Sequence, residues 1–253
     1  MIKAIFFTIF FFVLTASLSA GTTDPNVSDA KHIEYGSKHE CVVSIFGKQD
    51  IDDKQFFASA VIIKPKIILT AAHVIKDTKD AYINFKDSKI KIQYAIYPNA
   101  FDEKNISKHD IAICLLETPC ELNFYPELYE NDDELGKVCS IAGFGMHGSY
   151  DKGIIGYDGK KRAGSNIVEE ISDGMLFCTL TDKKTSLEML PSIGDSGGGL
   201  FINQKLAGIN SIVYTKEKNG KLDSNMKDGS GHTRISLHIN WIKELIEALE
   251  KVE

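Results

Sequence analysis

Three short stretches of this sequence carry residue types suited to nucleophilic catalysis. They read Thr70-Ala71-Ala72-His73, His109-Asp110-Ile111-Ala112 and Gly194-Asp195-Ser196-Gly197-Gly198-Gly199. Each alone has an ordinary explanation: a histidine after a strand, an aspartate in a turn, or a glycine loop that turns or binds an anion. Together they supply a hydroxyl nucleophile, an imidazole base to activate it, and a carboxylate to orient that base. The candidate catalytic residues are therefore His73, Asp110 and Ser196.

The order of these residues along the chain adds to the argument. Histidine, aspartate and then serine is the order found in one of the three unrelated folds that carry this triad. Glycines around Ser196 allow a tight turn that presents backbone N–H groups to a developing oxyanion.

The elements that must position these residues are mostly strands. Short apolar segments, rich in β-branched and aromatic residues, end at Gly, Pro, Asn or Asp; they are Cys41–Phe46, Phe56–Ile63, Ile67–Thr70, Ala81–Phe85, Ile90–Ile96, Ile111–Leu116, Val138–Phe144, Met175–Leu180, Gly199–Ile202, Lys205–Val213 and His232–Ser236. This pattern predicts an all-β sandwich or barrel. Helical spacing is clear only at the end, in Ile239, Ile242, Leu245, Ile246 and Leu249, and predicts one C-terminal amphipathic helix. The acidic stretch 126–137 is a candidate linker, and 146–166 is expected to be a long loop.

Length and composition exclude several classes of protein. With 253 residues, 43% of them hydrophobic, the chain is long enough for one large domain or two modest ones and too apolar for a disordered protein. The formal net charge is −6, with no long basic run, so no nucleic-acid partner is expected.

The first 20 residues predict a secretory signal peptide. Lys3 precedes an apolar run from Ala4 to about Leu14 and then small residues up to Ala20. This run is shorter than the roughly 20 residues that a membrane-spanning helix needs. We expect a secreted or periplasmic protein with no membrane contact after signal removal.

The chain resembles the trypsin/chymotrypsin-like serine proteases, on the three motifs quoted above. Weaker matches are Ala142-Gly143-Phe144-Gly145, Leu206-Ala207-Gly208-Ile209-Asn210-Ser211 and Gly231-His232-Thr233-Arg234-Ile235. The resemblance implies two six-stranded antiparallel β-barrels that meet across a cleft, with a C-terminal α-helix. The implied division is a peptidase domain at 33–253, with the first barrel at 33–130, the second at 136–237 and the helix at 238–252.

The resemblance also implies a role for each site residue. His73 acts as general base and then general acid, Asp110 orients it, and Ser196 forms the acyl-enzyme. The N–H groups of Gly194 and Ser196 form the oxyanion hole, and the hydroxyl of Ser211 supports Asp110. The implied activity is a secreted serine endopeptidase, a monomer that acts on protein or peptide substrates and needs no metal or cofactor. The alternatives are an inactive homologue that acts as a binding protein, and a serine esterase.

The cysteines depart from the family pattern. Val74 stands where the family usually has a cysteine, and Cys139 and Cys178 lack their usual partners. Export makes disulfides possible, and a bridge between Cys41 and Cys120 is expected instead. Cys114, the fifth cysteine, lies in an apolar strand and is expected to be a buried hydrophobic residue.

Two further features concern activation and specificity. Ile33 lies at the family's usual distance before the catalytic histidine, so residues 21–32 are a possible propeptide whose removal would let the new amino terminus pair with Asp195; the alternative is that Ile33 simply begins a strand. The predicted specificity pocket contains Leu190, Pro191, Val213 and Ser230. The resemblance implies that Leu190 lies at the pocket floor, where no charge awaits a basic side chain, and that Val213 and Ser230 shorten the pocket from its walls, so cleavage after small or aliphatic residues is expected.

Overall fold

The protein is described here by a computed structural model. The described residues are 21–251, apart from 107, 181–183 and 216–227. The predicted signal peptide therefore lies outside the described residues. Within them, no helix combines the length and the apolar character needed to cross a membrane.

The first half of the chain forms a closed barrel of six strands. Its strands follow the order β2-β3-β4-β7-β6-β5 and comprise β2 (Val42–Gln49), β3 (Gln55–Lys64), β4 (Ile67–Thr70), β5 (Thr78–Phe85), β6 (Ser88–Ile96) and β7 (Ala112–Leu116). A 3₁₀ turn, η1 (Glu103–Asn105), lies between β6 and β7. Both faces of the barrel's strands carry fully buried aliphatic side chains: Ile45, Ile62, Ile68 and Ile83 share one face, and Leu69 and Ile113 lie on the other. Burial of these chains supplies the main driving force for the barrel.

The second half forms a curved sheet of seven strands in the described part of the chain. The order is β11-β8-β14-β15-β16-β13-β12, with β8 (Val138–Gly143), β11 (Arg162–Ile167), β12 (Glu170–Ser172), β13 (Met175–Thr179), β14 (Gly199–Ile202), β15 (Lys205–Thr215) and β16 (Asp228–Arg234). The all-β double-barrel prediction is confirmed, with one correction. The second barrel is a half-barrel of seven strands, because β12 extends the sheet beyond β13 instead of closing it onto β11.

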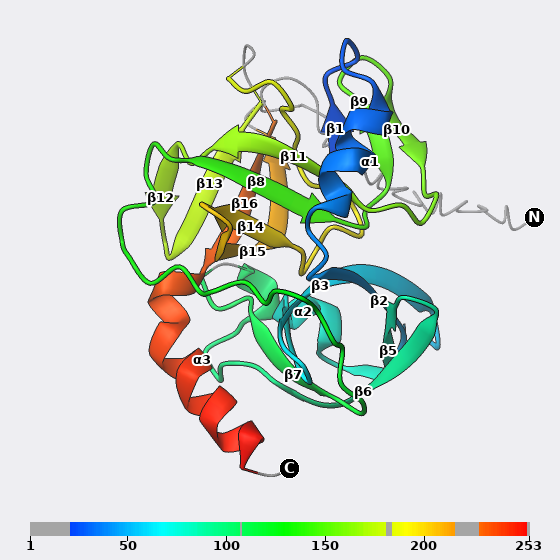
Figure 1. Cartoon of the computed structure of the whole chain (residues 1–253), viewed down its shortest axis with the longest axis vertical. Coiled ribbons are helices and arrows are strands. Elements are labelled where there is room, and N and C mark those ends of the chain that lie inside the picture. The colour runs from blue at the N-terminus through cyan, green and yellow to red at the C-terminus, as the bar shows by residue number, and fades with distance from the viewer. Residues whose placement is uncertain (1–20, 107, 181–183, 216–227, 252–253) are drawn as a thin grey trace, which may run out of the picture.

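The segment that follows the predicted signal peptide is folded onto the second half. Strand β1 (Gly21–Thr23) pairs in parallel with β9 (His147–Ser149), which also pairs with β10 (Gly153–Gly156). The predicted 146–166 loop therefore contains strands. Helix α1 (Asp29–Ser37) packs beside β11 (Figure 1), and a side chain at Gly36 would meet the backbone of Lys161 at 2.7 Å.

Charged contacts fix α1 in this position. Arg162 of β11 binds Asp29 of the helix at 2.6 Å and Asp158 at 2.9 Å. His32, fully buried on the same helix, bonds the carbonyl of Ala163 at 3.0 Å. The segment 21–32, predicted as a possible propeptide, is thus an ordered part of the full chain.

The C-terminal helix joins the two halves. Helix α3 (Ile235–Glu250) starts three residues before the predicted boundary, because Ile235 is already buried where β16 ends. The helix then runs alongside the first barrel (Figure 1). Leu245, Ile246 and Leu249 pack against the larger core cluster, which includes most of the first barrel's buried residues, as the amphipathic pattern predicts; Trp241, outside that pattern, packs there too.

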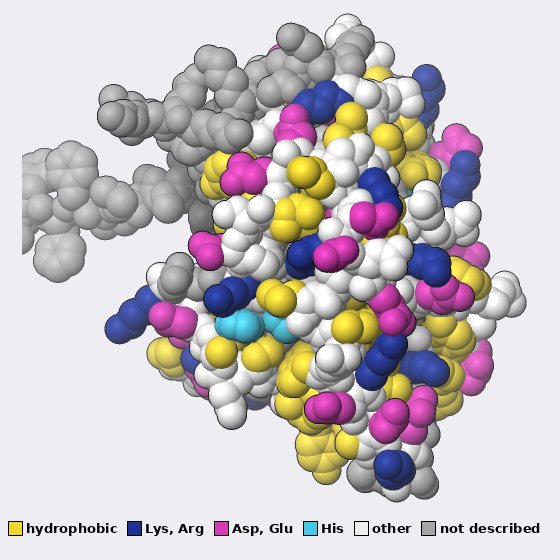
Figure 2. Space-filling view, turned by 90° about the vertical axis from the view of Figure 1, so that its left-hand side faces the viewer, with side chains coloured by type: hydrophobic (Ala, Val, Ile, Leu, Met, Phe, Trp, Pro, Cys, Tyr) yellow, Lys and Arg dark blue, Asp and Glu magenta, His cyan; other side chains and the backbone are white. Residues whose placement is uncertain are grey.

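The candidate linker 126–137 is also held in place. Glu134 is fully buried and forms an ion pair with Arg234 at 2.6 Å, and Ser236 donates a further hydrogen bond to it at 2.9 Å. These bonds fasten the connection between the halves to the start of α3. On the face shown in Figure 2, acidic and basic side chains are interspersed with small apolar areas.

Candidate active site

The histidine and the aspartate of the sequence motifs meet at one end of the first barrel. The buried strand β4 leads into the short helix α2 (Ala72–Ile75), which carries His73. Asp110 precedes β7, the neighbour of β4 in the barrel. The Nδ1 atom of His73 lies 2.7 Å from Oδ2 of Asp110, and the backbone N–H of His73 donates to Oδ1 at 2.9 Å. Both oxygens of the carboxylate therefore hold the histidine.

Two residues from the second half complete the surroundings of Asp110. The hydroxyl of Ser211 donates to Oδ2 at 2.5 Å, and that of Thr233 donates to the backbone carbonyl of Asp110 at 2.9 Å. Burial alone would raise the pKa of Asp110, but the hydrogen bond and charge of His73, with the Ser211 bond, hold this pKa below its usual value. The carboxylate thus stays ionised although its side chain is inaccessible to solvent. The role of Thr233 has no signal in the sequence.

The candidate nucleophile lies on a tight turn before β14. Ser196 is half-buried, and its neighbours Gly194 and Gly197 have φ values of +92° and +83°, a region that glycine adopts without strain. Gly197 packs against the first barrel so closely that a side chain there would collide with the hydroxyl of Thr70. Thr70 lies three residues before His73, so this turn and the histidine motif occupy the same part of the interface between the halves.

Asp195, beside the nucleophile, is buried in the second half. Its Oδ1 accepts a hydrogen bond from Gly145 N–H and its Oδ2 from Ser192 N–H, both at 2.7 Å. Burial raises the pKa of this carboxyl to about 6, against an ordinary value of 3.8. Ile33, the predicted partner of Asp195, lies within α1 in the uncleaved chain. The structure therefore does not pair these two residues, and activation at Ile33 stays a prediction.

The four predicted pocket residues lie in the second half of the chain. Leu190 and Pro191 are buried in the segment that leads into the nucleophile turn. Val213 of β15 and Ser230 of β16 are direct register partners, so they lie side by side on neighbouring strands, and their role as pocket walls stays a prediction. No charged residue is among the four.

A series of hydrogen bonds between buried polar side chains connects Ser230 to the nucleophile turn. The hydroxyl of Ser230 lies 2.9 Å from Nε2 of His232, whose Nδ1 lies 2.9 Å from Oδ1 of Asn210. The amide of Asn210 donates to the backbone carbonyl of Asp195 at 3.2 Å. Burial lowers the pKa of His232 to about 3, so this histidine is neutral. The sequence predicts a strand that begins at His232 but contains no signal for this series of hydrogen bonds.

The expected bridge between Cys41 and Cys120 is wrong for this structure, because both thiols are free and buried. The nearest approach is instead between Cys139 and Cys178, whose sulfurs lie 3.8 Å apart as two thiols. Cys114 is fully buried as expected, and burial raises the pKa of its thiol to about 12. Spacing along the chain carries no information about these distances.

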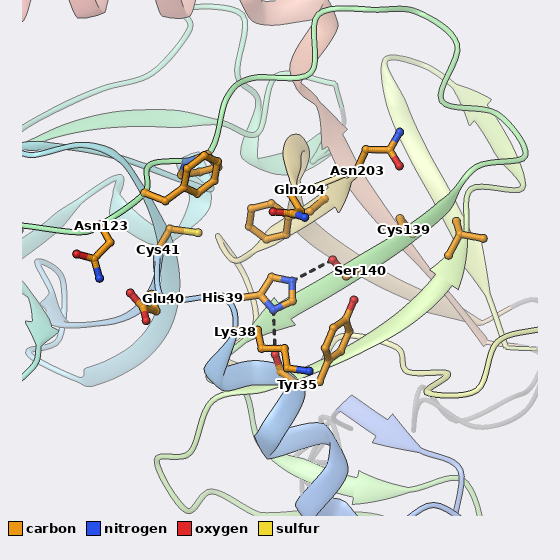
Figure 3. Close-up of a pocket in the computed structure, with 14 residues that line it drawn as sticks. Tyr35, Lys38, His39, Glu40, Cys41, Asn123, Cys139, Ser140, Asn203 and Gln204 are labelled. Carbon is orange, nitrogen blue, oxygen red and sulfur yellow. Dashed lines mark hydrogen bonds between the residues drawn. The ribbon is translucent and has the colours of Figure 1, made fainter.

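A pocket of about 660 Å³ lies apart from the triad residues, between α1, β8 and the segment that follows β7. His39 lies in this pocket (Figure 3), where it bonds the carbonyl of Tyr35 at 3.1 Å and the hydroxyl of Ser140 at 3.0 Å. Within the described residues, no group of three or more His, Cys, Asp and Glu side chains is arranged to hold a metal ion.

A double-barrel β fold with a His–Asp pair in one half and a glycine-rich serine turn in the other is typical of serine proteases. Residues 30–242 match the Trypsin family. The chain belongs to this family.

Curated relatives agree with this assignment at low identity. Horse (Equus caballus) kallikrein-1E2 is 22% identical over 221 residues, which cover 76% of this chain and 81% of the relative. Snake venom serine protease KN14 from Trimeresurus stejnegeri is 23% identical over 239 residues, which cover 83% and 84%.

Two solved structures share the fold. Neuropsin, a serine protease of mouse brain, superposes with a TM-score of 0.65 at 18% identity and covers 83% of this chain and 96% of its own. HL collagenase superposes with a TM-score of 0.67 at 15% identity and covers 84% and 95%. At these identities the similarity concerns the fold.

Proposed function

We propose that the protein is a serine endopeptidase that hydrolyses peptide bonds through an acyl-enzyme on Ser196. The observation that carries the proposal is the carboxylate of Asp110, which accepts hydrogen bonds from the ring and the backbone of His73 and from Ser211. A buried carboxylate so placed has one evident use: it fixes the imidazole tautomer and stabilises the imidazolium that forms during proton transfer.

The proposed steps follow from this arrangement. With Nδ1–H of His73 directed at Asp110, Nε2 is the atom that accepts the proton of Ser196 as its Oγ attacks the substrate carbonyl. The N–H groups of Gly194 and Ser196 then stabilise the oxyanion. His73 returns the proton to the leaving amine, and a water molecule repeats the sequence to release the acid product.

For specificity, we propose cleavage after small or aliphatic residues such as Ala, Val or Leu. Support comes from the uncharged side chains at the four pocket positions, and from Val213 and Ser230, which stand opposite one another on neighbouring strands. A basic side chain would lose its hydration there without gaining an opposite charge, which costs several kcal/mol. Large aromatic side chains of the substrate would clash with the side chains of Val213 and Ser230.

Export and activation belong to the proposal as well. The leader at 1–20 supports export to an extracellular or periplasmic compartment. Activation by cleavage before Ile33 would require α1 to unfold and the Arg162–Asp29 ion pair to break. Amino-terminal sequencing of the active protein decides this point, since a start at or near Gly21 would contradict activation at Ile33.

Labelling with a fluorophosphonate probe tests the proposed function. The wild-type protein should be modified at Ser196, while Ser196→Ala and heat-unfolded wild type should not react. If folded wild type is not labelled, either uncleaved or cleaved before Ile33, the proposed activity is refuted and the alternative of an inactive homologue that acts by binding is favoured. For a labelled protein, a peptide library then defines specificity, and dominant cleavage after Arg or Lys would contradict the assignment of Leu190 to the pocket.

A further inference from the structure

One serine of the first barrel forms hydrogen bonds with the nucleophile turn of the second half, which carries Gly194 and Ser196. Ser59 lies on β3 and is fully buried. Its hydroxyl donates to the carbonyl of Gly194 at 2.7 Å and accepts a hydrogen bond from the N–H of Phe144 at 2.9 Å. The donor and the acceptor function of this hydroxyl are therefore both engaged across the interface between the halves.

The backbone of Ser59 is bonded in the same place. Its N–H donates to the carbonyl of Ser196 at 2.9 Å, and its carbonyl accepts the hydroxyl of Thr70 at 2.8 Å. Ser59 therefore holds the turn at two carbonyls, those of Gly194 and Ser196. Thr70 connects this contact to the strand that leads to His73.

These bonds determine how the turn presents its N–H groups. The carbonyl of Ile193 accepts from Met146 N–H at 2.9 Å, so the N–H of Gly194, on the opposite side of the same trans peptide, points away from Met146. The bond from Ser59 to the carbonyl of Gly194 restrains the next peptide plane along the chain, whose N–H, that of Asp195, donates to the carbonyl of Ser192 at 2.9 Å. Gly194 lies between two fixed planes at a φ of +92°, where glycine has much rotational freedom. Without the hydroxyl, the second plane loses its side-chain restraint.

We propose that Ser59, a residue of the first barrel, is a positioning residue that sets the orientation of the nucleophile turn. This inference rests on the proposed function, since it concerns the same site. Ser59 does not touch substrate or reacting atoms. Its effect is to keep the N–H of Gly194 directed at the place where negative charge develops, which matters more for the transition state than for the bound substrate.

The test compares Ser59→Ala with Ser44→Ala. Ser44 is a buried serine on β2 and the direct register partner of Ser59, so it controls for the loss of a buried hydroxyl in the same barrel. Ser59→Ala should lower kcat about 10- to 100-fold with KM changed less than about 2-fold. Its affinity for a peptide aldehyde, whose adduct with the enzyme carries the oxyanion, should fall by the same factor as kcat. Ser44→Ala should keep the wild-type kcat and aldehyde affinity.

Active-site titration separates this role from a loss of folded protein. If Ser59→Ala merely unfolds a fraction of the molecules, the titrated sites decrease while kcat per site stays at the wild-type value, and the proposal is overturned. Ser59→Cys retains a weaker donor of similar size and should give an intermediate kcat. A Ser59→Cys variant no better than Ser59→Ala, in equally folded protein, also contradicts the proposal.

A readout without turnover keeps the test independent of the proposed function. Amide hydrogen exchange of the 190–198 segment should be faster in Ser59→Ala than in Ser44→Ala, because the turn loses a restraint only in the former. This difference is expected even if wild type fails to react with fluorophosphonate, in which case the activity is refuted and the positioning role stands. Equal exchange in the two variants refutes the positioning role whatever the activity.

Discussion

Each half of the molecule has a buried carboxylate beside a candidate catalytic residue, and the surroundings of the two carboxylates differ. Asp110, beside the closed barrel, is surrounded by hydrogen bonds that include the imidazole of His73, and its pKa is lowered. Asp195, in the half-barrel, accepts two backbone N–H groups, and burial raises its pKa to about 6. The first site favours the ionised carboxylate. The second is adapted to hold a turn, and its charge is destabilised by desolvation.

The same contrast holds for the main chain around each site. His73 follows a short buried strand of a closed barrel and needs no unusual backbone conformation. Ser196 lies on a turn between two glycines with positive φ, and it is held by contacts from β3 and β15. One half thus places the proposed base on regular structure, whereas the other places the proposed nucleophile on a turn that depends on its neighbours.

The largest decreases in kcat should come from removing the side chain of Ser196 in the second half or of His73 in the first half. We expect Ser196→Ala and His73→Ala each to lower kcat on the order of 10⁶-fold, with the fold unchanged by circular dichroism. The double variant should be no worse than either single one, because the two residues act as one unit. Additive losses in steady-state assays would show that the two halves contribute separately.

Asp110→Asn probes the ionised carboxylate. An amide can turn its NH₂ group toward His73 and favour the wrong imidazole tautomer, so kcat should fall on the order of 10⁴-fold. The loss is expected throughout the pH range above the lowered pKa of Asp110, where the wild-type carboxylate is charged. A pH–rate profile measures it, and a variant with wild-type kcat at pH 7 would refute the orienting role.

Asp195 should make stability depend on pH in the opposite sense to Asp110. Because its folded-state pKa is raised from 3.8 to about 6, its contribution to stability is complete below about pH 4 and decreases as the pH rises through 6. Asp110, with a lowered pKa, contributes above its ordinary pKa and loses this contribution as the pH falls. Relative to Asp195→Asn, wild type should lose about 3 kcal/mol of unfolding free energy between pH 4 and pH 7.

Urea unfolding at several pH values measures this difference directly. The comparison uses the change in the stability gap between the two proteins, because the substitution also alters the hydrogen bonds to Gly145 and Ser192. A gap that stays constant from pH 4 to pH 7 would show that Asp195 titrates normally.

The smallest expected decrease in kcat comes from removing the hydrogen bond between Ser211 of the second half and Asp110 of the first half. Ser211→Ala removes one hydrogen bond to an ionised group that His73 still holds. We expect about a 10-fold decrease in kcat, from the roughly 1.5 kcal/mol that such a bond contributes. Steady-state kinetics of Ser211→Ala and Asp110→Asn compare the two decreases in kcat. A larger decrease in Ser211→Ala than in Asp110→Asn would contradict the prediction.

The sequence predicted the parts of the fold that follow strong patterns. The six strands of the first barrel have runs of apolar residues, and the terminal helix has regular helical spacing. Helix α1 was missed because its buried residues are His32 and Gly36, which do not contribute to a hydrophobic pattern. Strands β1, β9 and β10 are three or four residues long, which is too short for alternation to be visible.

The candidate site was predicted unevenly for a similar reason. His73, Asp110, Ser196 and Ser211 belong to local motifs that the sequence displays. Ser59 lies inside an apolar strand, and its partners Phe144 and Gly194 lie far along the chain. Such contacts depend on how the two halves pack, and a single sequence contains no local signal for them.

The parallel pairing of β1 has a consequence for the order of folding. Thr23 of β1 bonds Gly148, and these residues are 125 positions apart in the chain. Pairing with so distant a partner does not stabilise the strand until the intervening chain is ordered. The reason is that the entropy of closing a long loop is lost before the non-local contacts can form. The first described segment to emerge during synthesis should therefore be among the last to dock, and refolding should include a late phase in which β1 becomes protected from hydrogen exchange.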